Sequence, residues 1–427
     1  MPATDLSVSR LLCGLFDASP TPYHTVATAV SRLDEAGFAE IGASDVIPAV
    51  GRNYWRSGGA LVAWSSAPHH DSESGFRVIG AHTDSPNLRV KPNPDTGGVG
   101  WLQLGVEIYG GVLLNSWLDR DLGLAGRVAI RGSEGPESVL FRDDRPILRI
   151  PQLAIHLDGD IREKGLLLNR QTHMAPVWGL GSEGPSFVAY LASRIETEPD
   201  DILGWDVMAH DLTPATIGGL EDEFLISARI DNQLSCFLAV EALAAVAEQA
   251  GPRIPMICLF DHEEVGSVST TGAASPLLGR VIERLGAAHH SDAEARARSR
   301  ADSLVVSADG AHATHPNYVD RHEAEHRIAL NGGPVLKVNS NQRYATDALT
   351  GAAFRLACEA AGVPMQTFVT RTDLGCGSTI GPATAGQLGI GVVDAGCAQL
   401  AMHSAREMAG SADPAWFAAA LEEVLKA

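Results

Sequence analysis

The chain has 427 residues, of which 45% are hydrophobic and 20% are charged, and its formal net charge is -20. This length exceeds the size at which a single hydrophobic core stops growing, so we expect two domains. So large a negative charge repels nucleic acids and anionic membranes, and we expect neither as a partner. The six cysteines form no Cys-x-x-Cys pair, which argues against a thiolate zinc site and against a disulfide framework.

The N-terminal segment MPATDLSVSRLLCGLF does not have the features of a secretion signal. It lacks a basic start, it carries Asp5, and its apolar run is short. No stretch of the sequence approaches the length of a membrane span. We therefore expect a reduced, cytoplasmic setting.

Residues 1–91 alternate helix and strand signals. Apolar residues at helical spacing predict helices, and short apolar runs predict strands. We expect helices at 6–18 and 23–36 and strands at 60–64 and 76–81. This rhythm is typical of the first segment of an α/β domain.

Residues 92–218 have a different character. Short alternating segments are separated by Gly, Pro and Asp turns, a pattern that predicts a separate, mostly β domain. We expect its strands at 101–109, 126–131, 138–142 and 147–157.

From residue 219 to residue 427 the α/β rhythm returns. Helices are expected at 232–248, 276–285, 345–361 and 415–426, and strands at 256–260, 304–308 and 389–393. We therefore predict an α/β fold with a mixed, mostly parallel sheet flanked by helices. The mostly β insertion at 92–218 interrupts this domain.

The segment ICLFDHEEVGS, from Ile257 to Ser267, carries the strongest signal for chemistry. Its apolar run reads as a buried strand that delivers Glu263 and Glu264 to the edge of a sheet, where open α/β sheets bind their ligands. One glutamate can hold a metal while its neighbour moves protons. The alternative is an acidic first turn of a helix, but the buried strand leaves little exposed surface for two charges.

Two further strands end in similar side chains. VIGAHTDSP ends its strand at His82, and Asp84 follows two residues later, a spacing that suits a metal-binding imidazole held by a carboxylate. ISARIDN ends its strand at Asp231, just before a helix. A helix N-cap is the commoner role for an aspartate at such a position.

The last two signals lie nearer the C-terminus. LVVSADGAHATHPNY ends a strand at Asp309, with His312 and His315 close behind. GIGVVDAGCAQLAMHSAREM places His403 at the head of an expected helix, where a single histidine is more often structural.

Taken together, these five segments predict one metal site. Two histidines and three carboxylates at strand ends can bind two divalent ions, and such ligands suit zinc, manganese or cobalt. A carboxylate shared between ions about 3.5–4 Å apart builds a hydrolytic centre, in which an unligated carboxylate serves as the general base.

Six blocks occur in order between about residues 76 and 410: GAHTDSPNLRVKP, SARIDNQLSCF, DHEEVGS, SADGAHATHPNY, GPVLKVNSNQRYATD and MHSAREM. This pattern resembles the aspartyl aminopeptidase family, whose members are dinuclear zinc exopeptidases that remove N-terminal Asp or Glu from peptides. The resemblance implies a zinc-exopeptidase-like fold. One departure is His262, where the family often has Asn, so His262 is either a hydrogen-bond donor behind the metal ligands or a third metal contact.

The resemblance also implies roles for individual residues. One metal would be held by His82, Asp231 and Asp309, and the second by Asp231, Glu264 and His403. Glu263 would be the general base, and Asp84 would orient His82.

The resemblance further implies a homo-oligomer. Enzymes of this family dimerise through the insertion domain and build a dodecamer, in which a histidine of the partner's insertion domain reaches the active site. The matching residue is His156, in the expected strand PQLAIHL. A purely structural role is the alternative, because strand histidines are usually structural.

An acidic substrate requires a local cation, because the chain itself is strongly negative. Lys337 is the leading candidate. Further candidates in blocks that resemble the family's site are His312, His315, Arg343 and Arg371. Each of these could instead belong to a solvated face, and either arginine could pair with a nearby aspartate.

These observations predict a metalloaminopeptidase that prefers peptides with N-terminal Asp or Glu and uses two divalent ions, zinc in the first place and manganese or cobalt as alternatives. Two other functions stay open. One is a metal-dependent carboxypeptidase or deacylase of the same wider clan. The other is a non-catalytic, metal-stabilised assembly protein, against which the adjacent pair of glutamates argues, because a structural site needs no unligated base.

Overall fold

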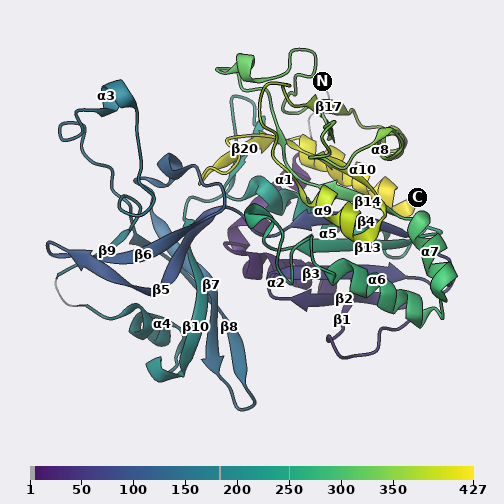
Figure 1. Ribbon diagram of the computed structural model, residues 1–427, viewed down its shortest axis with the longest axis horizontal. Helices are drawn as coiled ribbons and strands as arrows, with labels where there is room; N and C mark the ends of the chain where they lie inside the picture. Colours follow the sequence, from purple (N-terminus) through teal and green to yellow (C-terminus); the bar gives the residue numbers. More distant parts are fainter. Residues whose placement is uncertain (1–4, 182–183, 250) are drawn as a thin grey trace. The chain divides into compact units, whose positions relative to one another are not determined.

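The computed structural model describes residues 5–181, 184–249 and 251–427 (Figure 1). It divides into two compact units. The first unit comprises Met1–Asp84, Ala215–Met402 and Glu407–Ala427, and the second comprises Ser85–Pro214 and His403–Arg406. The insertion predicted from the sequence covers residues 92–218. In the described ranges, no helix is long and apolar enough to cross a membrane.

A nine-stranded sheet forms the centre of the first unit. In spatial order its strands are β1 (Ala39–Glu40), β2 (Gly51–Ser57), β3 (Ala60–Ser66), β13 (Ile254–Phe260), β4 (Phe76–His82), β14 (Leu304–Ala308), β18 (Gly391–Gly396), β16 (Val335–Val338) and β17 (Gln366–Val369). The four central strands, β13, β4, β14 and β18, run parallel. The predicted α/β class with a mixed, mostly parallel sheet is confirmed.

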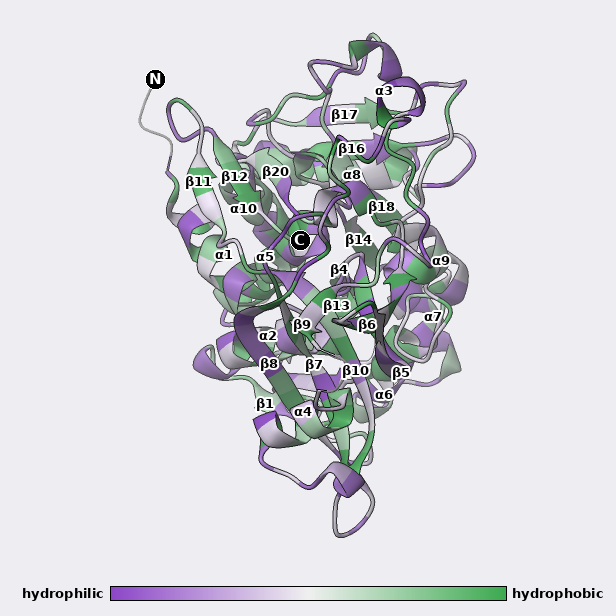
Figure 2. Cartoon of the chain, turned by 90° about the vertical axis from the view of Figure 1, so that its left-hand side faces the viewer, coloured by the Kyte–Doolittle hydropathy of each residue, from purple (hydrophilic) through white to green (hydrophobic). Residues whose placement is uncertain are grey.

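Helices cover both faces of this sheet. They are α1 (Ser7–Ala18), α2 (Pro22–Glu35), α5 (Ile230–Val246), α6 (Leu277–Ala288), α7 (Ala293–Ala301), α8 (Ala348–Ala361), α9 (Ile380–Leu388) and α10 (Asp413–Lys426). The strands alternate between two cores: in β4, Ile79 and Ala81 pack with α1, α2, α5, α8 and α10, whereas Val78 packs with α6 and α9. Burial on both faces explains why β13, with the sequence IPMICLF, is continuously apolar. In Figure 2, β13 is largely hydrophobic, whereas α1 alternates between hydrophobic and hydrophilic residues.

A five-stranded sheet completes the first unit. Its order is β11 (Thr216–Gly218), β12 (Phe224–Ser227), β20 (Glu407–Gly410), β19 (Ala398–Leu400) and β15 (Ala311–His312). The strand expected to end at Asp231 therefore stops earlier, at Ser227. Arg229 has a φ of 58°, in the left-handed region, which turns the chain from β12 into α5.

The second unit is built on a six-stranded antiparallel sheet. Its order is β8 (Pro136–Leu148), β7 (Leu122–Arg131), β10 (Ile202–Asp211), β5 (Asn87–Gly98), β6 (Trp101–Tyr109) and β9 (Val177–Leu180). The unit also contains the helices α3 (Ile161–Lys164) and α4 (Phe187–Ile195). Phe187 and Leu191 of α4 pack on the apolar face of the sheet and close its core.

Two further expectations from the sequence are wrong. The strand expected at 147–157 ends at Leu148, Arg149 forms an isolated bridge with Val177, and residues 155–157 form an exposed turn. The helix expected after His403 does not form. Ala401 and His403 have φ values of 56° and 69°, which a right-handed helix cannot accommodate, and β20 follows instead.

Candidate functional site

The ends of three neighbouring strands bring the first site residues together. In the parallel pair β13–β4, Phe260 lies opposite His82, so both strands end at the same level. In the parallel pair β14–β4, Ser307 lies opposite Gly80. Asp309 therefore follows β14 at the level of His82, and its Oδ1 is 3.6 Å from His82 Nε2. The register of the parallel sheet places these side chains at one edge.

Asp231 reaches the same place from a different element. It lies in the first turn of α5, where its φ and ψ of -80° and 105° are not helical. Its backbone N–H donates to Glu407 Oε2 at 2.9 Å, and its Oδ1 is 3.3 Å from His82 Nε2. The N-cap position of α5 is Arg229, so Asp231 lies inside the first turn and is not the N-cap residue. Asp231 thus faces His82 from an irregular helix start.

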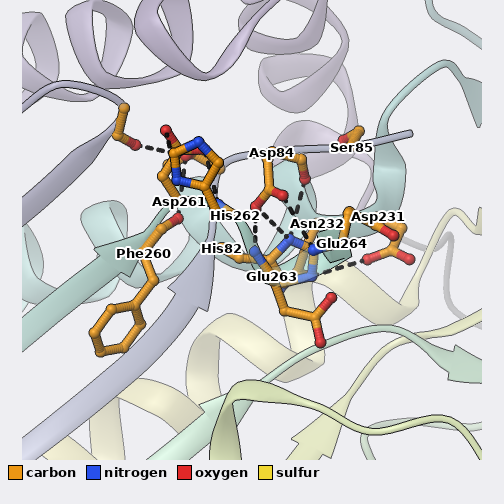
Figure 3. Close-up of polar contacts among 12 residues, drawn as sticks. His82, Asp84, Ser85, Asp231, Asn232, Phe260, Asp261, His262, Glu263 and Glu264 are labelled. Carbon is orange, nitrogen blue, oxygen red and sulfur yellow. Dashed lines mark hydrogen bonds and ion pairs between the residues drawn. The ribbon is translucent and has the colours of Figure 1, made fainter. Parts of the chain in front are cut away.

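His82, Asp231 and Glu264 form a compact cluster (Figure 3). One potential ligand atom from each of the three lies within 4.8 Å of the other two. His82 and Asp231 are buried, and Glu264 is partly buried. Glu264 belongs to a short 3-10 turn, Glu263–Val265, that begins three residues after β13 ends. The structure places the Glu263–Glu264 pair just after the end of β13, as expected from the sequence.

The Asp84 carboxylate holds this turn against His82. Its two oxygens accept the backbone N–H groups of Glu263 and Glu264, each at 3.1 Å. His82 Nδ1 is 3.0 Å from the Asp84 carbonyl oxygen and 3.5 Å from its Oδ1. A proton on Nδ1 satisfies these acceptors, and Nε2 faces Asp231 and Asp309, where a cation bound between the carboxylates would replace the Nε2 proton. This is the orientation of a metal-binding imidazole.

The cluster concentrates negative charge in a buried place. Burial raises the pKa of Glu263 to about 7 and that of Glu264 well above its usual value, and the neighbouring carboxylate of Asp231 adds to both shifts. Burial opposes a charge on His82, but its hydrogen bonds to Asp231 and Asp309 outweigh burial and raise the pKa of the imidazole. A divalent cation among these groups would relieve the repulsion, and imidazole nitrogen with carboxylate oxygen is a donor set that suits zinc.

Lys337, predicted to contact an acidic substrate, is buried beside Asp309. Its Nζ donates to the Gly310 carbonyl at 2.9 Å and to Asp309 Oδ2 at 3.3 Å, and it lies 5.1 Å from the centre of the Tyr344 ring. Only 2% of the residue is exposed. Its charge therefore already compensates Asp309.

The other predicted cations lie on more open segments. His312 is exposed on β15, and its ring is 6.1 Å from that of Phe368. The ring of His315 contacts that of Tyr318, and Arg343 is exposed. Arg371 forms a two-point ion pair with Asp373 at 2.6 and 2.7 Å, which confirms the pairing with a nearby aspartate that the sequence left open.

Two predicted histidines belong to the second unit. His403 Nδ1 is 3.1 Å from the Gly111 carbonyl oxygen, and His156 lies in the exposed turn at residues 155–157. His262 belongs to the first unit, where its Nδ1 is 3.0 Å from Ser269 Oγ and 3.3 Å from Thr271 Oγ1. These contacts tie the segment before Glu263 to the chain that follows it.

Two residues around the site were missed from the sequence. Glu407 accepts the Asp231 N–H, and Asn232 Nδ2 donates to the Ala308 carbonyl at 2.8 Å. The signal for Glu407 was an acid in MHSAREM, between Arg406 and Met408 and inside a block already assigned to the site. Asn232 directly follows Asp231, and this position was its only signal in the sequence.

The double acceptor role of Asp84 leads to a prediction for Asp84→Asn. An amide offers one oxygen where two backbone N–H groups need acceptors, so the turn that carries Glu264 should shift. We expect zinc affinity to fall about 10- to 100-fold, measured by competition with a chromophoric chelator. Asp71→Asn is the matched control, because exposed Asp71 also accepts two backbone N–H groups, from Glu73 and Ser74. Equal zinc affinity in the two variants would contradict this role.

Comparison with known proteins agrees with this geometry. A model of the peptidase family described as "Aminopeptidase I zinc metalloprotease (M18)" matches residues 15–423. A protein of Streptomyces coelicolor named "Probable M18 family aminopeptidase 2" is 49% identical over 420 residues, which cover 97% of this chain and 96% of that protein.

Solved structures show the same fold. The structure described as the Ape4 and Nbr1 complex matches with a TM-score of 0.93 and 35% identity, covering 98% of this chain and 85% of that chain. The S. cerevisiae mApe1 dodecamer matches with a TM-score of 0.85 and 27% identity, covering 98% and 96%. The family resemblance seen in the sequence is confirmed: the chain belongs to the M18 family of zinc metalloproteases and is a metallo-aminopeptidase.

Proposed function

We propose that this aminopeptidase uses two zinc ions to remove N-terminal Asp or Glu from peptides. The observation that carries the proposal is the pair Glu263–Glu264, held by one carboxylate beside His82 and Asp231. A structural metal site would need the ligand but not its neighbour. The family membership favours an aminopeptidase over the carboxypeptidase, deacylase and assembly functions that the sequence left open.

The residues of the chain divide into two ligand sets in this proposal. The first set is His82, Asp231 and Asp309, and the second is Asp231, Glu264 and His403. The short distances from His82 Nε2 to Asp231 and Asp309 support the first set, and the cluster with Glu264 supports part of the second. His403 enters from the sequence resemblance. Ions held by these residues would lower the pKa of bound water and polarise the scissile carbonyl.

Glu263 is the proton carrier in this mechanism. Its carboxylate accepts a proton from the attacking water and returns it to the leaving amine. Burial raises its pKa to about 7, and bound cations would lower this value, so the carboxylate is ionised at neutral pH and still basic enough to accept a proton. Asp84 fixes the position of Glu263 through its backbone N–H.

Glu263→Gln tests the mechanism. Gln has almost the same shape but cannot accept the proton, so we expect both zinc ions to be retained and turnover to fall by at least about 10²- to 10⁴-fold. Zinc content by elemental analysis and kcat on a chromogenic amide are the measurements. Glu264→Gln is the companion variant, and we expect it to lose zinc as well as turnover. Full turnover in Glu263→Gln would remove Glu263 from the mechanism.

The acidic preference is proposed to rest on the cations near Asp309. Lys337 lies beside that carboxylate, and His312, His315 and Arg343 follow on more exposed segments. A substrate carboxylate would share Lys337 with Asp309 and draw further attraction from the other three. Hydrogen bonds to charged groups contribute about 1.5–3 kcal/mol, which corresponds to about 10- to 100-fold in selectivity.

We expect kcat/KM for Asp and Glu amides to exceed that for Leu and Lys amides by about 10- to 100-fold. The panel should be measured with zinc, manganese and cobalt. Lys337→Met should reduce the ratio of Asp to Leu cleavage. Arg371→Met should not, because Asp373 already binds Arg371 at two points, at 2.7 and 2.6 Å, whereas Lys337 meets Asp309 through a single longer contact of 3.3 Å. Equal cleavage of all four amides by the wild-type enzyme would contradict the acidic preference.

We also propose a homo-oligomer, a dodecamer built from dimers through the β-rich insertion, in which His156 contributes to the active site of a partner. A related protein is described as a dodecamer. The turn around His156 supports the proposal because it exposes large apolar side chains: Leu153 (60%), Ile155 (51%) and Leu157 (74%). Exposed apolar patches are typical of protein interfaces.

Complementation between subunits tests this role for His156. We expect His156→Ala to keep the native mass by light scattering but to lose turnover, whereas His69→Ala, at another exposed histidine, should keep both. Coexpressed His156→Ala and Glu263→Gln subunits should regain turnover, because each supplies what the other lacks. Failure of the mixed oligomer to exceed either parent, or a monomeric wild-type chain, would contradict the proposal.

A further inference from the structure

Glu407 is a buried acid beside the metal cluster to which the proposed mechanism gives no role. It is the first residue of β20, and only 2% of it is exposed. Its Oε2 accepts the backbone N–H of Asp231 at 2.9 Å, across 176 residues of sequence. Burying a carboxylate close to other carboxylates is unfavourable, so we expect a specific contact to stabilise Glu407 at this position.

The first turn of α5 explains what this contact does. The first N–H groups of a helix have no acceptor within the helix. The N–H of Asp231 is one of these, and the charged oxygen of Glu407 makes a stronger acceptor than a neutral group. Because the φ and ψ of Asp231 are not helical, the helix itself does not determine where this residue points.

The neighbouring contacts make the arrangement specific. Strand pairing places Glu407 directly opposite Ser227, the last residue of β12. Ser227 lies four residues before Asp231, so the pairing fixes the Glu407 backbone beside the Asp231 segment. On the other side, Asn232 Nδ2 donates to the carbonyl of Ala308, the residue before Asp309. The Asp231 segment is therefore held from two directions, from β20 at its own N–H and from the end of β14 at Asn232.

We propose that Glu407 is a positioning residue of the metal centre, whose carboxylate fixes the Asp231 backbone so that the Asp231 side chain faces His82. The inference rests on the proposed function, because it concerns Asp231 as a shared ligand. Glu407 acts through a hydrogen bond from a backbone group and not through contact with substrate. This role requires an oxygen acceptor opposite the Asp231 N–H, and the position of that oxygen matters more than its charge.

Two variants separate position from charge. Glu407→Gln keeps an oxygen acceptor at nearly the same place and removes the charge. Glu407→Asp keeps the charge and withdraws the oxygen by one methylene. We expect Glu407→Gln to keep its zinc affinity within about 3-fold of wild type. We expect Glu407→Asp to lose zinc affinity by about 10- to 100-fold, the range seen when a group that orients a metal ligand is altered. The reverse order would overturn the inference in favour of a purely electrostatic role.

Zinc affinity is measured on the intact protein by chelator competition, alongside zinc stoichiometry, kcat and KM. Excess zinc should restore part of the kcat of Glu407→Asp. Glu241→Leu is the control for stability, because Glu241 lies on the same helix and pairs with Arg32 away from the cluster. We expect it to lower the melting temperature without changing zinc affinity.

The remaining outcomes are also decisive. If Glu407→Asp binds zinc as the wild type does, the inference is wrong, whatever its melting temperature. If the wild-type chain itself binds no zinc in the same assay, the proposed function fails and the inference fails with it. The wild-type measurement therefore distinguishes the two failures.

Discussion

The whole site depends on the crowding of carboxylates around one buried imidazole. Asp231 and Asp309 both approach His82 Nε2 within 3.6 Å, and Glu264 joins them. Without a cation such a group repels itself, as the raised pKa values of Glu263 and Glu264 indicate. A zinc ion held by these groups would relieve the repulsion, and an unligated carboxylate beside it would then be available for proton transfer.

The parallel sheet makes this crowding possible. β13, β4 and β14 end at the same edge because their register is fixed over continuously buried residues. A slip of one residue would exchange the two faces of a strand and direct its buried side chains to the wrong core. The hydrophobic cores on both faces therefore specify the position of the candidate ligands as well as the stability of the fold. The Asp84 carboxylate then holds the Glu263–Glu264 turn at this edge of the sheet by accepting both backbone N–H groups.

Much of the site could be predicted from the sequence, since an apolar run that stops at a charged residue marks a strand end. His82, Asp309 and the glutamate pair follow from this rule. Asp231 was expected at the end of a strand and lies on a different element: β12 belongs to the smaller sheet and stops at Ser227, and a left-handed residue then redirects the chain. The left-handed turn at Arg229 involves one residue, and a pattern that repeats over several residues does not report a change at one position.

Other features depend on contacts that have no local signal. The hydrogen bond from Asp231 to Glu407 joins segments 176 residues apart, so neither segment alone points to it. Lys337 was selected by charge, and only the fold shows that its ammonium group already lies against Asp309. Alternation around His156 suggested a strand, but a strand also needs a partner, and partner choice is a property of the folded sheet.

The central claim is that these carboxylates and His82 surround metal ions and leave Glu263 unligated. Anomalous diffraction from crystals grown with zinc tests it most directly. The account predicts two zinc peaks about 3.5–4 Å apart, with Asp231 between them and the Glu263 carboxylate bound to neither. A Glu263 oxygen at zinc-ligand distance, or zinc bound only away from His82, would contradict it.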